Sequence, residues 1–189
     1  MRFSKGHKDA TRRHIVETAS RQFRKDGIAA VGIKGVMADA GLTIGGFYKH
    51  FESKDHLVQE AVLLALDEQR ASLVVDGKGL DLEGILRAYL SRQHRDNPEH
   101  GCPAAALLPE IARGSDDTRK AYSDRIEEMF QAIASKLSEA GTPDAGRKAF
   151  AIYSLLVGAI QVARAMINPD LSDSILEGSI QTALEIAAA

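Results

Sequence analysis

The residues best suited to contacting a polyanion stand together in one short stretch of the chain. Tyr48, Lys49 and His50 carry polar tips that can donate hydrogen bonds to phosphates or to base edges. Gly45 and Gly46 precede them, and each glycine weakens a helix by about 1 kcal/mol relative to alanine. A helix that has to lie close against DNA can accept this cost, because side chains at its N-terminal end would hold it away. The pattern therefore predicts a short helix that contacts a DNA duplex.

The turn before this segment has the composition of a helix-turn-helix. Gly41 supplies the backbone freedom that a sharp turn needs, and Leu42 can fill the core between the two helices. Thr43 is a good N-cap that can also donate to a phosphate. Three short helices within residues 9–50, with this turn before the third, predict a helix-turn-helix DNA-binding unit.

Lys54 is expected to add a phosphate contact. Ser53 is a suitable N-cap for the following helix, so Lys54 occupies a first-turn position where the helix dipole disfavours a cation. A phosphate above that N-terminus would resolve the conflict. The alternative is an exposed lysine without such a role, at a cost of about a few tenths of a kcal/mol.

Charge is distributed unevenly along the chain. Residues 1–56 contain 11 lysines and arginines against 6 aspartates and glutamates, and the remainder contains 13 against 20. The first part therefore has a net charge of +5 and the rest a net charge of −7. This asymmetry predicts that one end of the molecule meets nucleic acid. An interaction module whose basic end binds an acidic protein is an alternative.

A basic arm is expected at the N-terminus, along the DNA backbone or in a minor groove, with a disordered tail as the alternative. Its residues are Arg2, Lys5, Lys8, Arg12 and Arg13.

The elements that position these residues are expected to be helices only. Apolar periodicity and cap residues predict about nine helices and no strand. Their approximate ranges are 9–25, 33–40, 44–50, 54–72, 81–95, 103–113, 115–140, 143–167 and 172–187. Pro109 is expected to kink or break its helix. The predicted fold class is all-α: a three-helix unit followed by a helical bundle.

The stretch from Ile15 to Leu57 resembles the TetR family of transcriptional regulators. The matching residues are Ile15, Ala19, Phe23, Gly27, Val36, Ala40-Gly41-Leu42-Thr43, Gly46-Phe47-Tyr48-Lys49-His50-Phe51 and Ser53-Lys54-Asp55-His56-Leu57. Val31-Gly32 departs from the family's usual Thr/Ser cap, and Met37 replaces a usual Ala. The resemblance implies a DNA-binding domain at residues 1–53 and a ligand-binding and dimerisation domain at 54–189. It also implies phosphate or base contacts from Lys34, Thr43, Gly45, Gly46, Tyr48, Lys49, His50 and Lys54.

The C-terminal part is expected to hold a ligand pocket and the dimer interface. Polar or soft residues on otherwise apolar helical faces are typical of ligand sites, although ordinary core packing is the alternative for each of them. The candidates are Tyr89, Gln93, Cys102, Met129, Phe130 and Tyr153. The last two helices are apolar around most of their circumference, which predicts that a second subunit covers part of them. The expected interface residues are Phe150, Leu155, Val162, Ile175, Ile180 and Leu184.

Cys102 is the one cysteine, and it precedes a predicted helix start. The positive end of a helix can lower the pKa of a thiol, so an electrophile- or redox-sensing repressor is an alternative function. A small buried hydrophobe is the other interpretation of this residue.

Other classes of function lack their signatures in the sequence. No glycine-rich phosphate loop, metal-ligand spacing or nucleophile elbow is found, so neither an enzyme nor a cofactor or metal is expected. A helical enzyme would need a converging acid-base or nucleophile set. No secretory signal and no apolar run of membrane-spanning length is found, which predicts a cytoplasmic protein that does not contact a membrane. The expected function is a homodimeric repressor with two recognition helices about 34–36 Å apart on a palindromic operator, released by a small-molecule effector.

Overall fold

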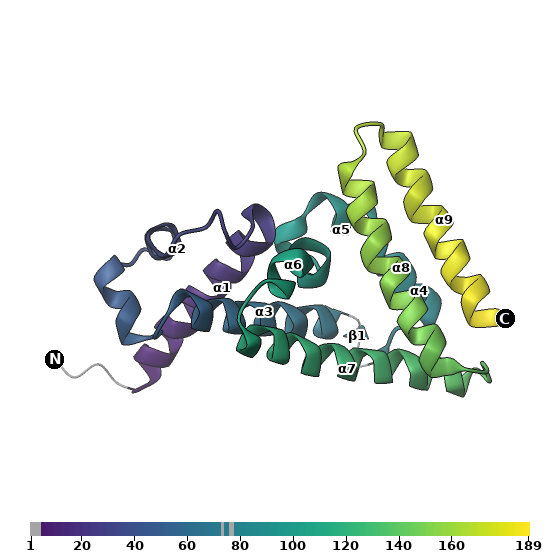
Figure 1. Cartoon of the computed structure of the whole chain (residues 1–189), viewed down its shortest axis with the longest axis horizontal. Coiled ribbons are helices and arrows are strands. Elements are labelled where there is room, and N and C mark those ends of the chain that lie inside the picture. The colour runs from purple at the N-terminus through teal and green to yellow at the C-terminus, as the bar shows by residue number, and fades with distance from the viewer. Residues whose placement is uncertain (1–4, 73, 76–77) are drawn as a thin grey trace.

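The N-terminal helices lie at one end of the molecule, in a computed structural model that describes residues 5–72, 74–75 and 78–189 (Figure 1). They are α1 (Lys5–Asp26), α2 (Ile33–Asp39) and the 3₁₀ helix η1 (Ile44–Lys49), followed by the long helix α3 (Lys54–Ser72). Gly27 and Gly41 adopt φ values of +88° and +69°, which confirms the left-handed helix end and the sharp turn expected at these positions. The predicted helix-turn-helix is therefore present.

The rest of the described chain is a helical bundle. Its elements are α4 (Leu82–Tyr89), α5 (Arg92–Asp96), the 3₁₀ helix η2 (Pro98–His100), α6 (Pro103–Ala112), α7 (Asp116–Glu139), α8 (Ala145–Ala165) and α9 (Pro169–Ala188). Helix α7 packs along α3, and α8 and α9 form an antiparallel pair at the end of the molecule opposite the N-terminal helices (Figure 1). The all-α fold class predicted from the sequence is confirmed.

Three predicted details are wrong, two of them because a different side chain caps the helix. The helix expected at 81–95 is broken at Leu90, since the Ser91 hydroxyl accepts the His94 N–H at 3.1 Å and starts α5. Helix α8 begins at Ala145 instead of at Pro143. The final helix is capped by Asn168, whose side chain accepts two backbone N–H groups, and not by Ser172.

A short hairpin also departs from the prediction of no strands. Strand β1 (Val74–Val75) pairs antiparallel with β2 (Lys78–Gly79), with Val74 opposite Gly79 and Val75 opposite Lys78. Two valines followed by an Asp-Gly dipeptide are a hairpin signal in the sequence.

Pro109 does not break α6, which continues to Ala112. A proline has no N–H to donate to the carbonyl four residues earlier, here that of Ala105. Arg164 of α8 supplies a donor instead, because its Nη1 lies 3.0 Å from the Ala105 oxygen. A bond between helices thus replaces the bond that is lost within α6.

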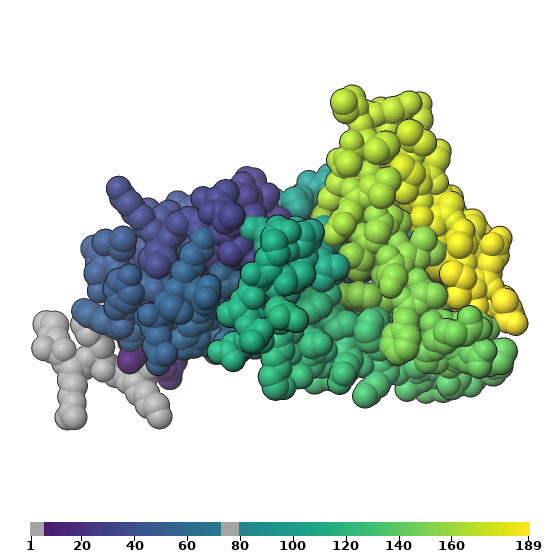
Figure 2. All heavy atoms as spheres, in the orientation of Figure 1, coloured from purple at the N-terminus to yellow at the C-terminus, as the bar shows by residue number. Residues whose placement is uncertain are grey.

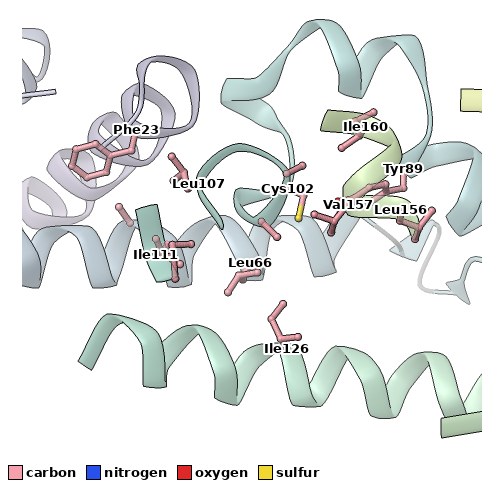
Figure 3. Packing of buried hydrophobic residues seen from close by; sticks show 14 of the residues in the cluster. Phe23, Leu66, Tyr89, Cys102, Leu107, Ile111, Ile126, Leu156, Val157 and Ile160 are labelled. Carbon is pink, nitrogen blue, oxygen red and sulfur yellow. The ribbon is translucent and has the colours of Figure 1, made fainter. Parts of the chain in front are cut away.

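Helix α6 also joins the N-terminal helices to the bundle. Figure 3 shows Leu107 and Ile111 of α6 between Phe23 of α1 and the α3 helix, within one buried apolar cluster that runs from Ile15 to Ala183. The core is continuous between the two parts of the chain. They are therefore expected to unfold together.

A carboxylate on α6 secures the turn after α1. Glu110 accepts the backbone N–H groups of Ile28 at 3.1 Å and of Ala29 at 2.8 Å. A Cβ at Gly27 would come within 3.2 Å of this carboxylate and would sit on a left-handed backbone. Glycine is therefore required at position 27 for two reasons.

Helix α8 is long and apolar enough, by length and composition alone, to cross a membrane, which was not expected from the sequence. Half of its apolar window is buried inside the molecule, as in the core helix of a folded domain.

Candidate functional site: an exposed recognition segment and two internal cavities

The segment predicted to contact DNA is exposed at the end of the molecule remote from α8 and α9 (Figure 2). It forms the 3₁₀ helix η1 rather than an α-helix. Phe47 is fully buried and stacks on Phe51 with 5.4 Å between ring centroids, whereas Tyr48 is 70% exposed. One ring thus fixes the segment to the core while the next points to solvent.

The glycines of η1 are not explained by packing within the protein. No atom of the described residues lies within 4 Å of a Cβ built on Gly45, and the one contact at Gly46 is Met37 Cε at an ordinary 3.6 Å. Neither glycine has a positive φ. The fold would therefore accept side chains at both positions.

Most residues predicted to contact DNA are accessible. Lys34, Thr43, Gly45, Tyr48 and Lys49 are exposed, and Gly46, His50 and Lys54 are half-buried. Thr43 stands at the N-cap position of η1, but its hydroxyl makes no capping bond with any described residue, contrary to its expected capping role.

The protein itself provides a partner for Lys54 and a desolvating environment for His50. The Lys54 ammonium donates to the carbonyl oxygen of Ile28 at 2.5 Å and lies 6.0 Å from the Phe23 ring centroid. This bond accounts for a lysine in the first turn of α3 without a phosphate. Burial lowers the pKa of His50, and the nearby charges of Lys8, Arg12 and Lys49 lower it further.

The basic arm is not an extended tail over its described part, because α1 already begins at Lys5. Arg2 lies outside the described residues. Arg12 pairs with Glu60 of α3 and stands 4.7 Å above the Phe51 ring, so it fastens α1 to α3. Lys8 and Arg13 are exposed on α1.

The expected interface residues divide into three groups by their exposure. Phe150 and Val162 are about half exposed, and Leu155, Ile175 and Leu184 are half-buried. Ile180 is 3% exposed, because it packs within the subunit with Leu176 and Ala183 on the inner face of α9, and its assignment to a subunit interface is wrong. Two exposed apolar residues that the sequence analysis left out are Ile167 and Leu171.

An apolar cavity of about 190 Å³ lies between α3, α4, α7 and α8. Its lining includes Leu66, Gln69, Ile85, Tyr89, Arg125, Met129, Ile133, Tyr153 and Leu156. Three of the predicted ligand residues, Tyr89, Met129 and Tyr153, are thereby brought together. Phe130 is not part of this lining but stacks edge-on against the Tyr153 ring, with 5.2 Å between centroids.

A second, more polar cavity of about 380 Å³ adjoins the first. Its lining includes Glu68, Gln69, Tyr89, Gln93, His94, Asn97, Gly101 and Cys102. Tyr89 and Gln69 border both cavities. Gln69 and His94 were not predicted as site residues, because each is one polar residue within a helix and only the tertiary fold places it at a cavity.

Cys102 does not have the environment of a reactive thiol. It is 1% exposed, and burial raises the pKa of its thiol, although Tyr89 and the backbone at the start of α6 lower it in part. The lowered pKa on which the sensing alternative depended is therefore not found, since desolvation outweighs the helix start, and Cys102 has the surroundings of the other interpretation, a small buried hydrophobe.

His94 organises the segment that leads into α6. Its Nδ1 lies 2.6 Å from the Tyr89 carbonyl oxygen, and its Nε2 accepts the Cys102 N–H at 3.0 Å. Because the carbonyl can only accept, Nδ1 carries the proton and the ring is neutral. Burial lowers the pKa of His94, and the Arg164 charge lowers it further.

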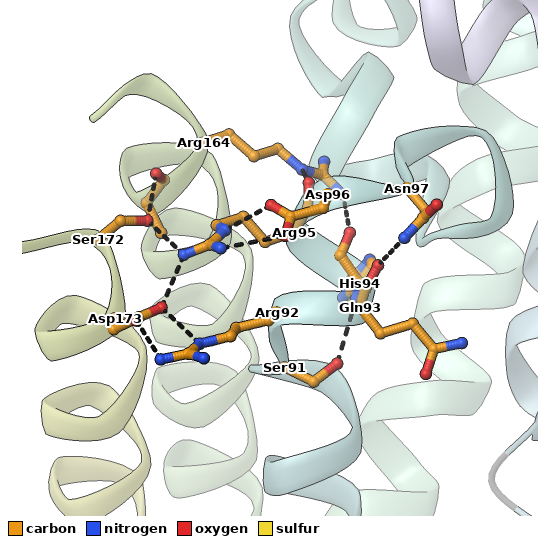
Figure 4. Close-up of polar contacts among 11 residues, drawn as sticks. Ser91, Arg92, Gln93, His94, Arg95, Asp96, Asn97, Arg164, Ser172 and Asp173 are labelled. Carbon is orange, nitrogen blue, oxygen red and sulfur yellow. Dashed lines mark hydrogen bonds and ion pairs between the residues drawn. The ribbon is translucent and has the colours of Figure 1, made fainter. Parts of the chain in front are cut away.

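Two arginines from different helices bind the same segment, and Figure 4 shows one of them, Arg164. Arg164 of α8 donates to the carbonyl oxygens of His94 at 2.7 Å and Arg95 at 3.0 Å. Arg24 of α1 donates to the Gly101 oxygen at 2.8 Å and pairs with Glu68 at 2.9 Å. The cavity wall is thus connected directly to the first helix.

The neutral state of His94 predicts a loss of stability in weak acid. Because the pKa of folded His94 is below its ordinary 6.5, its contribution to stability is complete above pH 6.5 and is lost as the pH falls through the folded value. Urea unfolding of the wild type and His94→Gln between pH 7.5 and 5 measures this. The wild type should lose more free energy of unfolding than the variant. Both retain His50, so equal losses would assign the effect to other groups.

Comparisons with known proteins agree with this architecture. Residues 15–61 match the family model "Bacterial regulatory proteins, tetR family", and residues 81–171 match the model "Transcriptional regulator LmrA/YxaF-like, C-terminal domain". The chain is 28% identical over 206 aligned positions to the HTH-type transcriptional regulator TtgR of Pseudomonas putida, covering 98% of this chain and 95% of that protein. It is 23% identical over 138 positions to the HTH-type transcriptional repressor KstR2 of Rhodococcus jostii, covering 72% and 68%.

Solved structures show the same fold. A TetR-family regulator from Cytophaga hutchinsonii superposes with a TM-score of 0.80 at 22% identity, covering 98% of both chains. The reduced form of E. coli NemR superposes with a TM-score of 0.76 at 21% identity, covering 93% of this chain and 96% of that one.

Proposed function

This chain belongs to the TetR family of bacterial regulatory proteins and is a DNA-binding transcriptional regulator, not an enzyme, and we propose how it acts from that premise. It works in the cytoplasm as a homodimeric repressor on a palindromic operator, and a small molecule in its internal cavities releases it. Residues 1–53 form its DNA-binding domain, and residues 54–189 bind the effector and the second subunit.

The observation that carries the DNA contact is the pair of glycines in η1. The fold has room for side chains at Gly45 and Gly46 and requires neither glycine for its backbone. A duplex that lies against the start of η1 supplies the missing reason, because a Cβ there would separate the segment from the groove. Exposed Tyr48 and Lys49 then reach phosphates or base edges.

The exposed face of α8 and α9 is the proposed dimer interface. Phe150, Ser154, Gly158 and Val162 follow one another at intervals of four residues on α8, and all four are exposed. No described atom lies within 4 Å of a Cβ built on Gly158, or on Gly178 of α9. A glycine within the exposed stripe of α8, and an exposed glycine on α9, permit two helix pairs to approach closely.

Fluorescence anisotropy with DNA from the promoter next to the regulator's own gene tests the proposal. Sub-micromolar, salt-sensitive binding is expected, with much weaker binding to random DNA of equal length. Equal binding to both sequences would contradict it. Retention of a protein partner without DNA binding would favour an interaction module instead.

Replacing Lys49 by alanine is expected to weaken binding to all DNA sequences alike. Loss of one phosphate contact should reduce the slope of log K against log salt by about 0.9. Because Lys49 is exposed, the free energy of unfolding should stay within about 0.5 kcal/mol of the wild type. Lys120→Ala, on the exposed face of α7, is the control and should leave the slope unchanged. An unchanged slope in Lys49→Ala would exclude this phosphate contact.

Lys54→Ala separates the two roles of Lys54. The same decrease in slope is expected if its ammonium reaches a phosphate. A decrease in stability without a change in slope would leave only its bond to the Ile28 carbonyl.

A further inference from the structure

Buried polar atoms without partners are concentrated at the apolar cavity. Among the described residues, five buried side-chain nitrogen or oxygen atoms make no hydrogen bond. Three of them, the Tyr89 hydroxyl, Gln69 Oε1 and Arg125 Nε, belong to residues that line this one cavity. A buried polar group left unpaired is costly, so three at one place indicate a site that binds a polar group.

Tyr89 and Gln69 stand closest to the boundary between the two cavities. Tyr89 is 7% exposed, and both side chains lie beside the Cys102 thiol, which is only a weak hydrogen-bonding group. Gln69 Oε1 can only accept, and the Tyr89 hydroxyl can donate or accept. A ligand group that satisfies both atoms must therefore be able to donate.

The remaining lining favours an uncharged ligand over a highly charged one. Leu66, Ile85, Met129, Ile133 and Leu156 surround the cavity with apolar atoms. The charged residues at its edge are largely paired with each other between α3 and α7, through Arg70–Glu128 at 2.9 Å and Arg125–Asp67 at 3.3 Å. Lys136 and the unpaired Nε of Arg125 also belong to this lining, so an anion is the competing ligand class. An anion, however, cannot donate to Gln69 Oε1.

We propose that the effector is a small, uncharged, largely apolar molecule with a hydroxyl group that Tyr89 and Gln69 bind. This inference rests on the effector-controlled function proposed above. The hydroxyl donates to Gln69 Oε1 and accepts from the Tyr89 hydroxyl. The cavity of about 190 Å³ is smaller than the sites of drug-sized ligands, so the molecule has one or two rings.

A hydroxyl bound at this place also lies beside the connection to α1. The Tyr89 carbonyl oxygen accepts a hydrogen bond from His94 Nδ1, and His94 Nε2 accepts one from the Cys102 N–H. The adjacent Gly101 oxygen accepts one from Arg24. Any shift of Tyr89 toward the ligand acts on this chain of bonds.

Three probes of the same ring system test the proposal by calorimetry on the full chain without DNA. They are 5-indanol, indane, and the anion indane-5-carboxylate. 5-Indanol is expected to bind the wild type at least about 10-fold more tightly than indane, because indane leaves both polar atoms unpaired. The ratio of the affinities for 5-indanol and indane should fall to about 1 in the double variant Tyr89→Phe, Gln69→Met.

The variants should remain folded, since removing unpaired buried polar atoms is neutral or stabilising, and thermal unfolding verifies this. Any of four outcomes would overturn the inference. They are equal affinity of the wild type for 5-indanol and indane, a preference for 5-indanol that persists in the double variant, tighter binding of the carboxylate than of 5-indanol, and no binding of any probe. Since no DNA is present, these outcomes are independent of the anisotropy test of the proposed function.

Discussion

Replacing Phe47 by alanine is expected to unfold the recognition segment and abolish operator binding. Phe47 is fully buried, stacks on Phe51, and is the buried residue of η1. Truncating a buried phenylalanine costs about 3–5 kcal/mol, and a 3₁₀ helix with glycines at its second and third positions has little stability of its own. Urea unfolding followed by circular dichroism should show this loss, and anisotropy should show no specific binding.

The neighbouring substitution Tyr48→Phe is the matched control. It removes one solvent-exposed hydroxyl and keeps the edge-on contact between the Tyr48 and Phe47 rings at 5.2 Å. The free energy of unfolding should not change, whereas operator affinity should fall by about 10-fold if the hydroxyl donates to a phosphate. Wild-type DNA binding by Phe47→Ala would show that η1 is not the recognition element. Wild-type binding by Tyr48→Phe would remove only this hydroxyl from the contact.

Replacing Gly158 by leucine is expected to separate the subunits while leaving each subunit folded. Within one subunit the new side chain meets no described atom near its Cβ, and leucine favours helix over glycine by most of about 1 kcal/mol. At the interface proposed for α8 and α9, the same side chain would hold the helices apart. Sedimentation equilibrium should show a monomer, and affinity for the palindromic operator should fall by about 100-fold or more through loss of two-site binding.

Gly158→Ala is the control for this experiment. It adds one methyl group and the same preference for helix, but it leaves most of the close approach intact, so the dimer should persist. If Gly158→Leu stays dimeric and binds the operator like the wild type, the subunits meet through a different surface.

Local features of the sequence predicted most of the fold. Gly27, Gly41, Ser53 and Ser115 end or cap helices where expected, because each acts through backbone atoms close to it in sequence. The same local reasoning failed at Ser91, which was counted as a helical residue although its hydroxyl starts a new helix.

The candidate site was predicted less completely, because its parts meet only in the folded chain. Tyr89, Met129 and Tyr153 were expected at a pocket, but Gln69 has no local signal that distinguishes it from other helical glutamines. Pro109 was expected to disturb its helix, and only the position of Arg164, 59 residues along the chain from the Ala105 carbonyl, explains why α6 continues. Likewise, burial of Cys102 reverses the pKa shift that its place before a helix suggests.

Two polar attachments of the N-terminal part of the chain, one to Gly101 just before α6 and one to Glu110 within α6, have one property in common. Arg24 donates to the carbonyl oxygen of Gly101, and Glu110 accepts the N–H groups of Ile28 and Ala29. In each case one partner is a main-chain atom. Main-chain atoms are the same whatever the side chain. Substitutions in the cavity lining or in the recognition segment η1 can therefore occur without loss of these hydrogen bonds. A regulator built in this way can acquire a new effector and keep its old operator as long as Arg24 and Glu110 are both kept.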